Sequence, residues 1–324
     1  MNFIEKIRAK AKENLKTIVM PEGEEPRMIE AAAFLHKEKL VTPTLLGNPQ
    51  IISDKAEELK ADIKDIRIIE PAKAPEISEF ADEYYELRKH KGMTPEEAKK
   101  TVQDPLFFGA FMLRRGMIDS AVAGSINATG NVLRAAIQVV GLAEGIKVVS
   151  SSFAMILKDG REFTFADCAV IPDPDEEQLA SIAISSTHTH RGLIGTEANV
   201  AMLSFSTKGS ASHPSVDKVV NALNIVKQKA PEINIDGELQ FDAALLDSVG
   251  QRKAPGSPVA GKANVFIFPD LNSANIGYKI AQRLGSAEAI GPTIQGLAKP
   301  YNDLSRGCSV EDIINVACIC SILA

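Results

Sequence analysis

Apolar and polar residues form two kinds of pattern that alternate along the chain. Short runs rich in β-branched residues are separated by longer segments in which apolar residues recur at helical spacing. The short runs predict strands at residues 17–20, 44–46, 66–69 and 120–123. The longer segments predict helices at residues 26–39, 49–60, 76–91 and 105–115. Such regular strand–helix alternation is typical of an α/β fold with a parallel sheet.

The strand–helix alternation is interrupted near residue 150. Residues 153–157 and 162–170 flank a polar turn and predict a β-hairpin, and antiparallel pairing inside an α/β chain indicates a second sheet. Alternation then resumes, with predicted strands at residues 200–205 and 265–268. Further helices are predicted at residues 175–190, 214–229, 272–284 and 310–323.

Two short motifs suggest other chemistries, and their context argues against both. Residues 256–263 nearly spell a P-loop, but Ala263 replaces the Mg²⁺-binding hydroxyl and the segment precedes a strand instead of following one. We interpret residues 251–263, rich in Gly, Pro and Ala, as a surface loop. His188 and His190 lie in a helical pattern, which favours a polar helix end over a zinc site.

Length, charge and cysteine content narrow the class of protein. The chain has 324 residues, enough for roughly two domains. Its formal net charge of −6 argues against a nucleic-acid partner held by bulk charge. Four cysteines without a CxxC pair predict free thiols in a reducing compartment. The sequence shows no signal-peptide pattern and no apolar run long enough for a membrane span, so we expect a cytoplasmic protein.

Residues 124–134 are the first stretch that carries candidate chemistry. An apolar strand runs into small polar residues and then into a helix, and the carboxyl ends of strands in an α/β sheet are where ligands bind. Amides at a helix start favour an anion. Arg134 falls in the first helical turn, where its charge opposes the helix dipole. It is either a ligand-binding residue or a solvated surface arginine.

A second candidate stretch spans residues 303–312. Ser305, Arg306 and Asp312 can surround one reacting centre, because an arginine stabilises negative charge, a hydroxyl donates a hydrogen bond and a carboxylate takes a proton. Alternatively, Ser309 and Asp312 form a capping box and the carboxylate is structural.

Residues 85–94 form a third candidate stretch, a basic cluster that contains Arg88. The cluster either binds an anion or simply complements the dipole at the end of a helix. Thr94-Pro95-Glu96-Glu97 has the pattern of another capping box.

Five motifs in order resemble the phosphate acetyltransferase (phosphotransacetylase) family over essentially the whole chain. They lie at residues 86–95, 124–134, 248–253, 268–278 and 300–308. The resemblance implies interconversion of acetyl-CoA plus phosphate with acetyl phosphate plus coenzyme A. It also implies a direct ternary complex with neither an acetyl-enzyme nor a metal. The nearest competing family is phosphate butyryltransferase.

The resemblance also implies a fold, a partner and a set of residue roles. We expect two α/β/α domains, residues 1–145 with 295–324 and residues 146–294, with the active cleft between them, and a homodimer. Coenzyme A is expected as a substrate, and no cofactor is bound permanently. Asp312 is the expected base, Arg306 the charge stabiliser and Ser305 a hydrogen-bond donor. The expected substrate-binding residues are Arg88, Arg134, Thr129, Ser125 and Asn127.

A second class of function stays open at this point. A catalytically silent binding protein could share the fold and would tolerate loss of Arg306 or Asp312. Both residues are present, which favours an enzyme.

Overall fold

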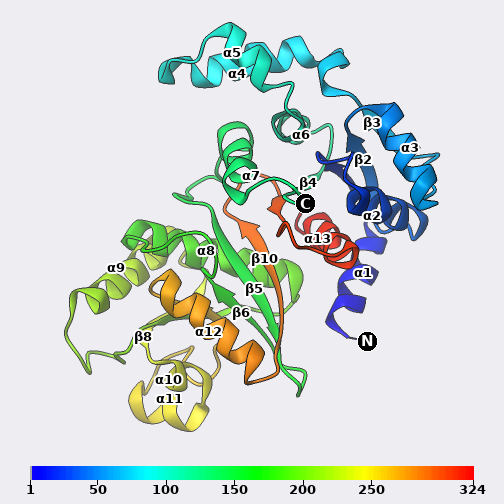
Figure 1. The fold of residues 1–324 in the computed structure, drawn as a ribbon. Coiled ribbons are helices and arrows are strands. Elements are labelled where there is room, and N and C mark those ends of the chain that lie inside the picture. Colours follow the sequence, from blue (N-terminus) through cyan, green and yellow to red (C-terminus); the bar gives the residue numbers. More distant parts are fainter. Residues whose placement is uncertain (1) are drawn as a thin grey trace. The chain divides into compact units, whose positions relative to one another are not determined.

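A five-stranded parallel sheet forms the centre of the first of two structural units. The computed structural model describes residues 2–324, and the two units are residues up to Gly141 together with Leu297–Ala324, and Leu142–Gly296 (Figure 1). The first sheet has the strand order β11-β4-β1-β2-β3. Its strands are β1 (Thr17–Met20), β2 (Thr42–Leu46), β3 (Arg67–Ile69), β4 (Ser120–Ala123) and β11 (Tyr301–Asp303).

The order of these strands reverses beside β1. The chain adds β2 and β3 on one side of β1, then β4 and finally β11 on the other side. All neighbouring strands pair in parallel, so their carboxyl ends share one edge. In open α/β sheets, the point where the strand order reverses is where ligands bind. The boundary between β1 and β4 is therefore the place to look for a site.

Helices cover both faces of this sheet. Val19 and Ala121 contact a buried cluster that includes Phe80 and Phe111, whose rings stack at 5.2 Å. Neighbouring strand residues such as Ile18 point to the opposite face, because side chains alternate along a strand, and they are equally buried. The helices of this unit are α1 (Phe3–Glu13), α2 (Pro26–Lys37), α3 (Pro49–Leu59), α4 (Ile77–Arg88), α5 (Pro95–Thr101), α6 (Pro105–Arg114), α7 (Thr129–Ala135) and α13 (Val310–Leu323). Figure 1 shows the last helix, α13, beside the first, α1.

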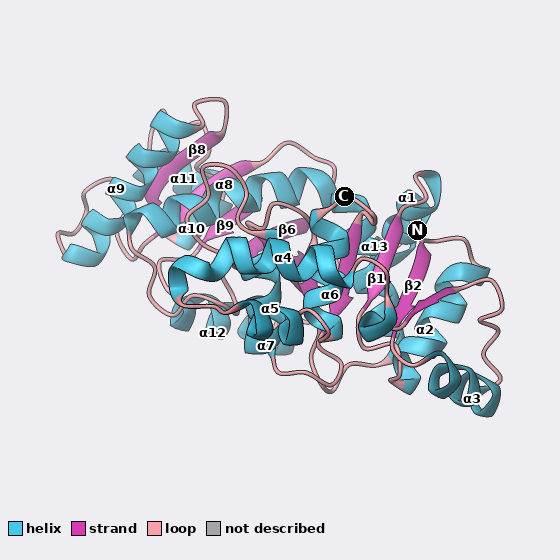
Figure 2. Cartoon of the chain, turned by 90° about the horizontal axis from the view of Figure 1, so that it is seen from above, coloured by secondary structure: helices cyan, strands magenta, loops and turns pink. Residues whose placement is uncertain are grey.

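The second unit contains a six-stranded mixed sheet with the order β10-β5-β6-β9-β7-β8. Strand β5 pairs antiparallel with both β10 and β6, and the remaining pairs are parallel. The strands are β5 (Ser150–Ile156), β6 (Glu162–Ala166), β7 (Asn199–Leu203), β8 (Asn234–Leu239), β9 (Val265–Ile267) and β10 (Glu288–Gln295). The helices, seen from above in Figure 2, are α8 (Glu176–Leu193), α9 (Pro214–Lys229), α10 (Phe241–Leu245), α11 (Asp247–Lys253) and α12 (Leu271–Arg283).

These observations confirm the predicted fold class, an α/β protein with a parallel sheet and a second sheet that carries an antiparallel hairpin. Two local predictions need correction. Residues 251–253 end α11, and the rest of the stretch to residue 263 is a loop, as predicted, but Ala254, Val259 and Ala263 are buried in a core cluster with Phe266. Small apolar residues without periodicity can pack as well as periodic ones.

The predicted helix end is found, because His188 and His190 lie near the end of α8, but the side chain of His190 is buried. The imidazole is buried in α8 between the hydroxyls of Thr164 at 2.9 Å and Thr196 at 3.0 Å. Burial lowers its pKa to about 4, so the ring is neutral at physiological pH. His188, in contrast, is exposed.

Candidate active site

Every residue predicted for the site lies in the first unit, and most follow the carboxyl ends of β4 and β11. The loop at residues 124–128 leaves β4, and the loop at residues 304–309 leaves β11. Asp303 pairs in register with Ala123, so the two loops start side by side. Glu22, two residues after β1, completes this edge. Most of the predicted residues therefore lie at the reversal point that the strand order indicates.

Glu22 holds the loop after β4 through an unusually complete set of hydrogen bonds. Its Oε2 accepts from the amides of Gly124 at 2.9 Å and Ser125 at 2.7 Å, and from the Ser125 hydroxyl at 2.6 Å. Its Oε1 accepts from the amides of Ile126 at 3.2 Å and Asn127 at 2.9 Å, and from the Asn127 side-chain amide at 2.9 Å. Burial of Glu22 opposes ionisation, but these hydrogen bonds outweigh burial and lower its pKa.

This arrangement gives Ser125 and Asn127 a partner within the protein. Both side chains donate to Glu22, so their predicted contact with substrate stays a prediction. The amides that face an anion belong to the loop before α7 and not to the helix start, and the anion is the protein's own carboxylate.

Arg27 joins the two loops. One of its terminal nitrogens donates to the carbonyls of Arg306 at 3.0 Å and Cys308 at 2.7 Å, and the other donates to the Ser125 carbonyl at 2.9 Å. Its Nε is paired with Glu25 at 2.6 Å. Three backbone carbonyls from two loops are thus tied to one guanidinium.

Asp303 is a second buried carboxylate at this edge. Its Oδ2 accepts a hydrogen bond from the Thr129 hydroxyl at 2.6 Å, whereas its buried Oδ1 has no hydrogen-bond partner within residues 2–324. Burial raises the pKa of Asp303 to about 6; the Thr129 hydrogen bond opposes this change, and the negative charge of Glu22 adds to it. Gly124 packs against the carboxylate so closely that a Cβ there would lie 2.4 Å from Oδ1.

Asp312 forms the predicted capping box. Its Oδ2 accepts from the amide and the hydroxyl of Ser309, each at 2.8 Å, and its own amide donates to the Ser309 hydroxyl at 3.1 Å. Within the described chain, the Asp312 carboxylate accepts hydrogen bonds at Oδ2 only. The residue is exposed, so Oδ1 is accessible to a ligand. The cap is therefore confirmed, and it does not exclude a second role.

Ser305 and Arg306 are exposed at the tip of the loop after β11. The Ser305 hydroxyl accepts from the Gly307 amide at 3.2 Å. The Arg306 backbone is fixed by Arg27, whereas its guanidinium makes no hydrogen bond or ion pair within residues 2–324. The backbone of this loop is thus anchored, and its charged side chain is available.

Arg88 and Arg134 converge near the buried phenol of Tyr84. Burial raises the pKa of Tyr84, and the positive charges of both arginines oppose that change, so each lies near the hydroxyl. That hydroxyl donates to Gln138 at 2.6 Å. The Arg88 Nε is buried and lacks a hydrogen-bond partner in the described part of the chain. Arg134 contacts Asn131 at 2.8 Å and is otherwise exposed. The prediction that Arg134 lies in the first turn of its helix is wrong, because α7 begins at Thr129 and Arg134 is in its last turn. Two cations that are incompletely paired suit an anionic ligand.

A cavity of about 390 Å³ borders Glu22 and Asn127 at the same edge of the sheet. Glu24, Glu25 and Asp104 also line it, and Lys55 is its only cationic lining residue among those described. Because its walls are acidic, this cavity is a poor place for a phosphate.

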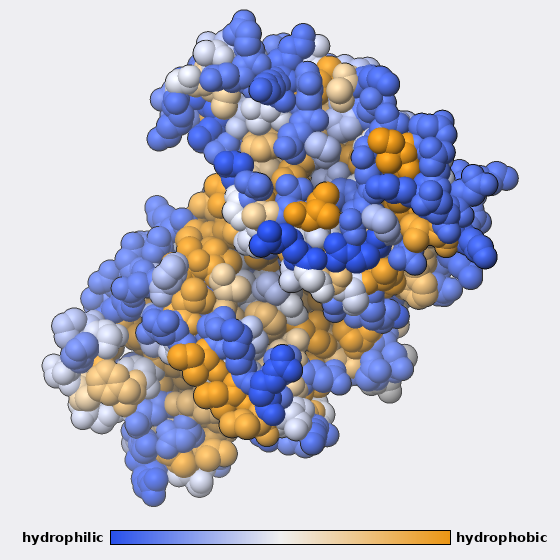
Figure 3. All heavy atoms as spheres, in the orientation of Figure 1, coloured by the Kyte–Doolittle hydropathy of each residue, from blue (hydrophilic) through white to orange (hydrophobic). Residues whose placement is uncertain are grey.

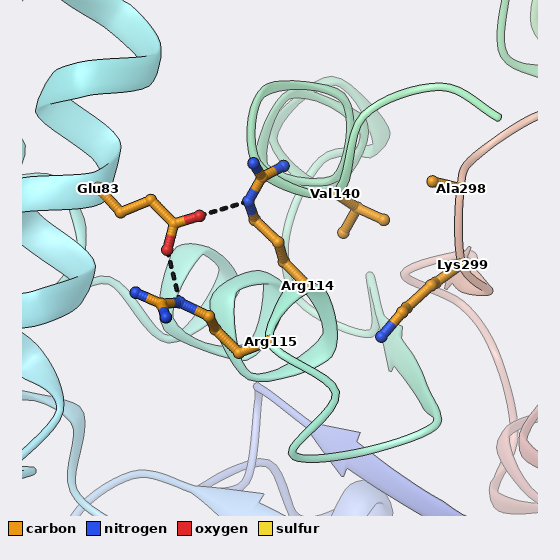
Figure 4. Close-up of a pocket in the computed structure, with 6 residues that line it drawn as sticks. All are labelled: Glu83, Arg114, Arg115, Val140, Ala298 and Lys299. Atoms are coloured by element: carbon orange, nitrogen blue, oxygen red, sulfur yellow. Dashed lines mark hydrogen bonds and ion pairs between the residues drawn. The ribbon is translucent and has the colours of Figure 1, made fainter. Parts of the chain in front are cut away.

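A larger cavity of about 520 Å³ lies at the end of α6, away from these loops (Figure 4). There the Glu83 carboxylate accepts from Arg114 and Arg115, each at 2.6 Å. Lys299 donates to the Leu113 carbonyl at 2.8 Å. The two arginines are thus used in an ion-pair network at the carboxyl end of a helix, where positive charge is stabilising, and Lys299 is used by a backbone carbonyl.

Comparison with known proteins assigns the chain to a family. A family model described as phosphate acetyl/butaryl transferase matches residues 2–321. The chain belongs to this family. It is 52% identical over 321 residues to a phosphate acetyltransferase of Thermoanaerobacterium thermosaccharolyticum, covering 98% of this chain and 97% of that one. It is 49% identical to a phosphate acetyltransferase of Clostridium acetobutylicum, again covering 98% and 97%.

Solved structures agree with this assignment. A phosphotransacetylase from Streptococcus pyogenes matches with a TM-score of 0.94 at 41% identity, covering 99% of this chain and 97% of that one. A branched-chain phosphotransacylase from Enterococcus faecalis matches with a TM-score of 0.68 at only 17% identity, which shows a shared fold alone. The similarity to acetyl-transferring relatives does not favour the butyryltransferase alternative.

Among residues 2–324, no group of three or more His, Cys, Asp or Glu side chains is placed to hold a metal ion. No helix in that range is both long and apolar enough to cross a membrane. All four cysteines are free and buried, as predicted.

Proposed function

We propose that the chain transfers an acetyl group between coenzyme A and phosphate by direct attack of the thiol on acetyl phosphate. The chain is a phosphate acetyltransferase by its full-length similarity to proteins of that name. The observation that best supports a site in the first unit is the convergence of the loops after β4 and β11, fixed to one another by Arg27.

In the proposed step, the sulfur of coenzyme A forms a bond to the acetyl carbonyl carbon and the carbon–oxygen bond to phosphate breaks. The thiol proton passes to a base, and phosphate leaves with the bonding electrons. Oxygen atoms of the carbonyl and of the departing phosphate gain negative charge. Arg306, whose guanidinium is exposed and unpaired within residues 2–324, would stabilise that charge. Ser305 would donate a hydrogen bond at the same centre.

Asp312 is the proposed base, acting through Oδ1 while Oδ2 caps α13. Its contribution has a ceiling, because a thiol with a pKa of about 8.5 is already a few per cent ionised at pH 7. Complete ionisation therefore gains about 30-fold at most, or about 2 kcal/mol. Removing one donor that stabilises a developing oxyanion costs about 10²–10³-fold. On these magnitudes, charge stabilisation by Arg306 outweighs proton removal.

Arg88 and Arg134 are proposed to hold the phosphoryl group. Their convergence near Tyr84 and the unpartnered Arg88 Nε support this role. The acidic cavity beside Glu22 offers no comparable cation. Thr129 is proposed to line the pocket, with its hydroxyl oriented by Asp303.

A homodimer is proposed on the basis of an apolar stripe on α12. Ile276 and Ile280 in α12 and Leu284 at its C-cap follow one another at intervals of four and are 58%, 53% and 83% exposed. Figure 3 shows apolar side chains gathered over this helix. The other face of α12 already packs on the core through Ala274 and Tyr278. The exposed apolar stripe therefore does not contribute to the core of a single chain, and such a surface is typical of a protein–protein interface. Ile280→Glu should reduce the mass measured by light scattering from that of a dimer to that of a monomer. The four buried free thiols suit a reducing cytoplasm.

The activity is tested by following the loss of the free coenzyme A thiol after addition of acetyl phosphate. Butyryl phosphate in a parallel reaction tests acyl preference, and rapid turnover is expected with the acetyl donor. Absence of thiol loss with either donor would support a silent binding protein.

The Asp312→Asn variant tests the base. The Asn side chain retains an oxygen that can cap α13, so the melting temperature should be nearly unchanged. Turnover at pH 7 should fall by about 10–30-fold and recover as the pH rises toward 8.5, because the substrate then ionises unaided. Normal turnover at pH 7 would remove Asp312 from proton transfer.

A further inference from the structure

Glu22 is a buried carboxylate at the reversal point of the sheet that no motif identifies. It is 5% exposed and lies between β1 and the loop after β4. Its two oxygens together accept six hydrogen bonds, all from residues 124–127. A single carboxylate therefore determines the conformation of four consecutive residues.

Those four residues form an anion-binding concavity. Successive backbone N–H groups that point to one centre make a nest, the feature that holds phosphate in many nucleotide-binding loops. Here the centre of the nest is filled by Glu22, which leaves no amide of residues 124–127 for a substrate phosphate. The hydrogen bonds also lower the pKa of Glu22, so the anion stays charged at neutral pH.

The backbone next to Glu22 is fixed independently of these hydrogen bonds. The Gly23 amide donates to the Leu46 carbonyl at 3.0 Å. A Cβ at Gly23 would lie 2.6 Å from that carbonyl oxygen, so the close approach requires glycine. Glu22 is thus presented from a rigid position between β1 and β2.

We propose that Glu22 is an internal anion that holds the loop at residues 124–127 in the conformation needed for acetyl transfer. It acts as a positioning residue, because it is buried and contacts the loop. Its effect extends to both sides of the site. The ordered loop leads directly to Thr129, and its Ser125 carbonyl binds Arg27, which anchors the backbone of Arg306.

The inference rests on the proposed acetyl-transfer function, and the test separates the two. The unmodified chain must first consume coenzyme A thiol with acetyl phosphate. If the unmodified chain does not do so, the proposed function is rejected. Only the variants test the role of Glu22. The variants are Glu22→Ala, which empties the nest, and Glu22→Gln, which keeps the shape and removes the charge. Whichever way the glutamine amide turns, its NH₂ group faces two backbone N–H donors.

Glu24→Gln is the matched control. It lies in the same segment and lines the same cavity, but its carboxylate accepts from the Asn48 amide and not from the loop. This variant should retain kcat/KM within about twofold of the unmodified chain. Melting temperature and circular dichroism identify the variants that are folded.

Both Glu22 variants should lose about 10²-fold in kcat/KM, the effect of misplacing a binding group by about 1 Å. Sodium formate, a carboxylate small enough for the emptied nest, should increase kcat/KM of Glu22→Ala several-fold over its value without formate. An equal concentration of sodium chloride should not, and formate should not accelerate the unmodified chain or Glu24→Gln. This rescue distinguishes a missing anion from a general loss of stability.

The inference fails if a folded Glu22 variant keeps kcat/KM within threefold of the unmodified chain. It also fails if Glu22→Ala is slow and formate has no effect on it. Should Glu22→Ala not fold, Glu22→Gln decides alone: a folded, slow enzyme supports the role, and a folded, normal enzyme overturns it.

Discussion

Replacing Asp303 by Asn should stabilise the first unit at neutral and alkaline pH. Asp303 is 6% exposed, its Oδ1 has no hydrogen-bond partner within residues 2–324, and Glu22 adds a second negative charge nearby. Ionising a group in such a place is costly. An asparagine retains an oxygen for the Thr129 hydroxyl but carries no charge.

The size of the effect follows from the pKa of Asp303, which burial raises from 3.8 to about 6. A difference of about 2 pH units corresponds to about 3 kcal/mol between the two protonation states. Between pH 3.8 and 6 the folded state binds more protons than the unfolded state, so stability falls as pH rises through this window. Above pH 6 the full cost is present, and Asp303→Asn removes it.

The measurement is thermal unfolding of both proteins between pH 4 and pH 8, with the exposed Asp82→Asn as control. The melting temperature of Asp303→Asn minus that of the unmodified chain should increase from pH 4 to pH 6.5 and then level off. The control should show no such increase. A difference that is constant across this range, or one that decreases as pH rises, would refute the reasoning.

Three predictions concern the reaction itself. Arg306→Ala should reduce kcat by about 10²–10³-fold, whereas Arg306→Lys keeps the positive charge and should lose less. A near-normal kcat in folded Arg306→Ala would exclude Arg306 from the mechanism. Cys308→Ala should keep turnover within a few-fold of the unmodified chain, because burial raises the pKa of the Cys308 thiol and so disfavours the nucleophilic thiolate. Radiolabelled acetyl trapped on the denatured enzyme would contradict this prediction. Arg88→Ala and Arg134→Ala should raise KM for acetyl phosphate by about 10–150-fold and KM for coenzyme A by less; equal increases would reject phosphoryl binding.

The strands and helices with a clear periodicity were predictable. Strands β1 and β4 and helices α9 and α13 have the predicted bounds, because apolar runs and caps coincide there. The capping box at Thr94 forms as its spacing indicates, with the hydroxyl accepting from the Glu97 amide. In these elements the local preference and the packing of the whole unit agree.

Three strands escaped prediction for identifiable reasons. Strand β8 buries Asp236 and Glu238, residue types depleted in strands, and satisfies them with Lys208 and with the Ser206 hydroxyl. Strand β10 contains Pro292, which is tolerated because β10 is an edge strand with a shift of register at that point. Strand β11 consists of Tyr301, Asn302 and Asp303, and Asn and Asp are depleted in strands.

Arg27 and Glu22, which hold the loops at residues 124–128 and 304–309, escaped prediction. Arg27 lies in the first turn of α2, where its charge opposes the helix dipole. The same signal drew attention to Arg134, wrongly, since Arg134 lies in the last turn of α7. Applied throughout the chain, that signal would have found Arg27. Glu22 could have been found as an acidic residue two positions after a buried strand. The six hydrogen bonds that it accepts could not, because they depend on the proximity of β1 and β4.

Asp312 shows why one motif supported two roles. The spacing from Ser309 predicts a cap, and the cap forms through Oδ2. The family resemblance predicts a base, and a base needs one accessible oxygen, which the exposed Oδ1 provides. A carboxylate has two oxygens, so the cap can fix the side chain in the rotamer that presents the other oxygen to a thiol. The structural role would then be the means of the chemical one, since a base contributes only when it is held within hydrogen-bond reach of its proton.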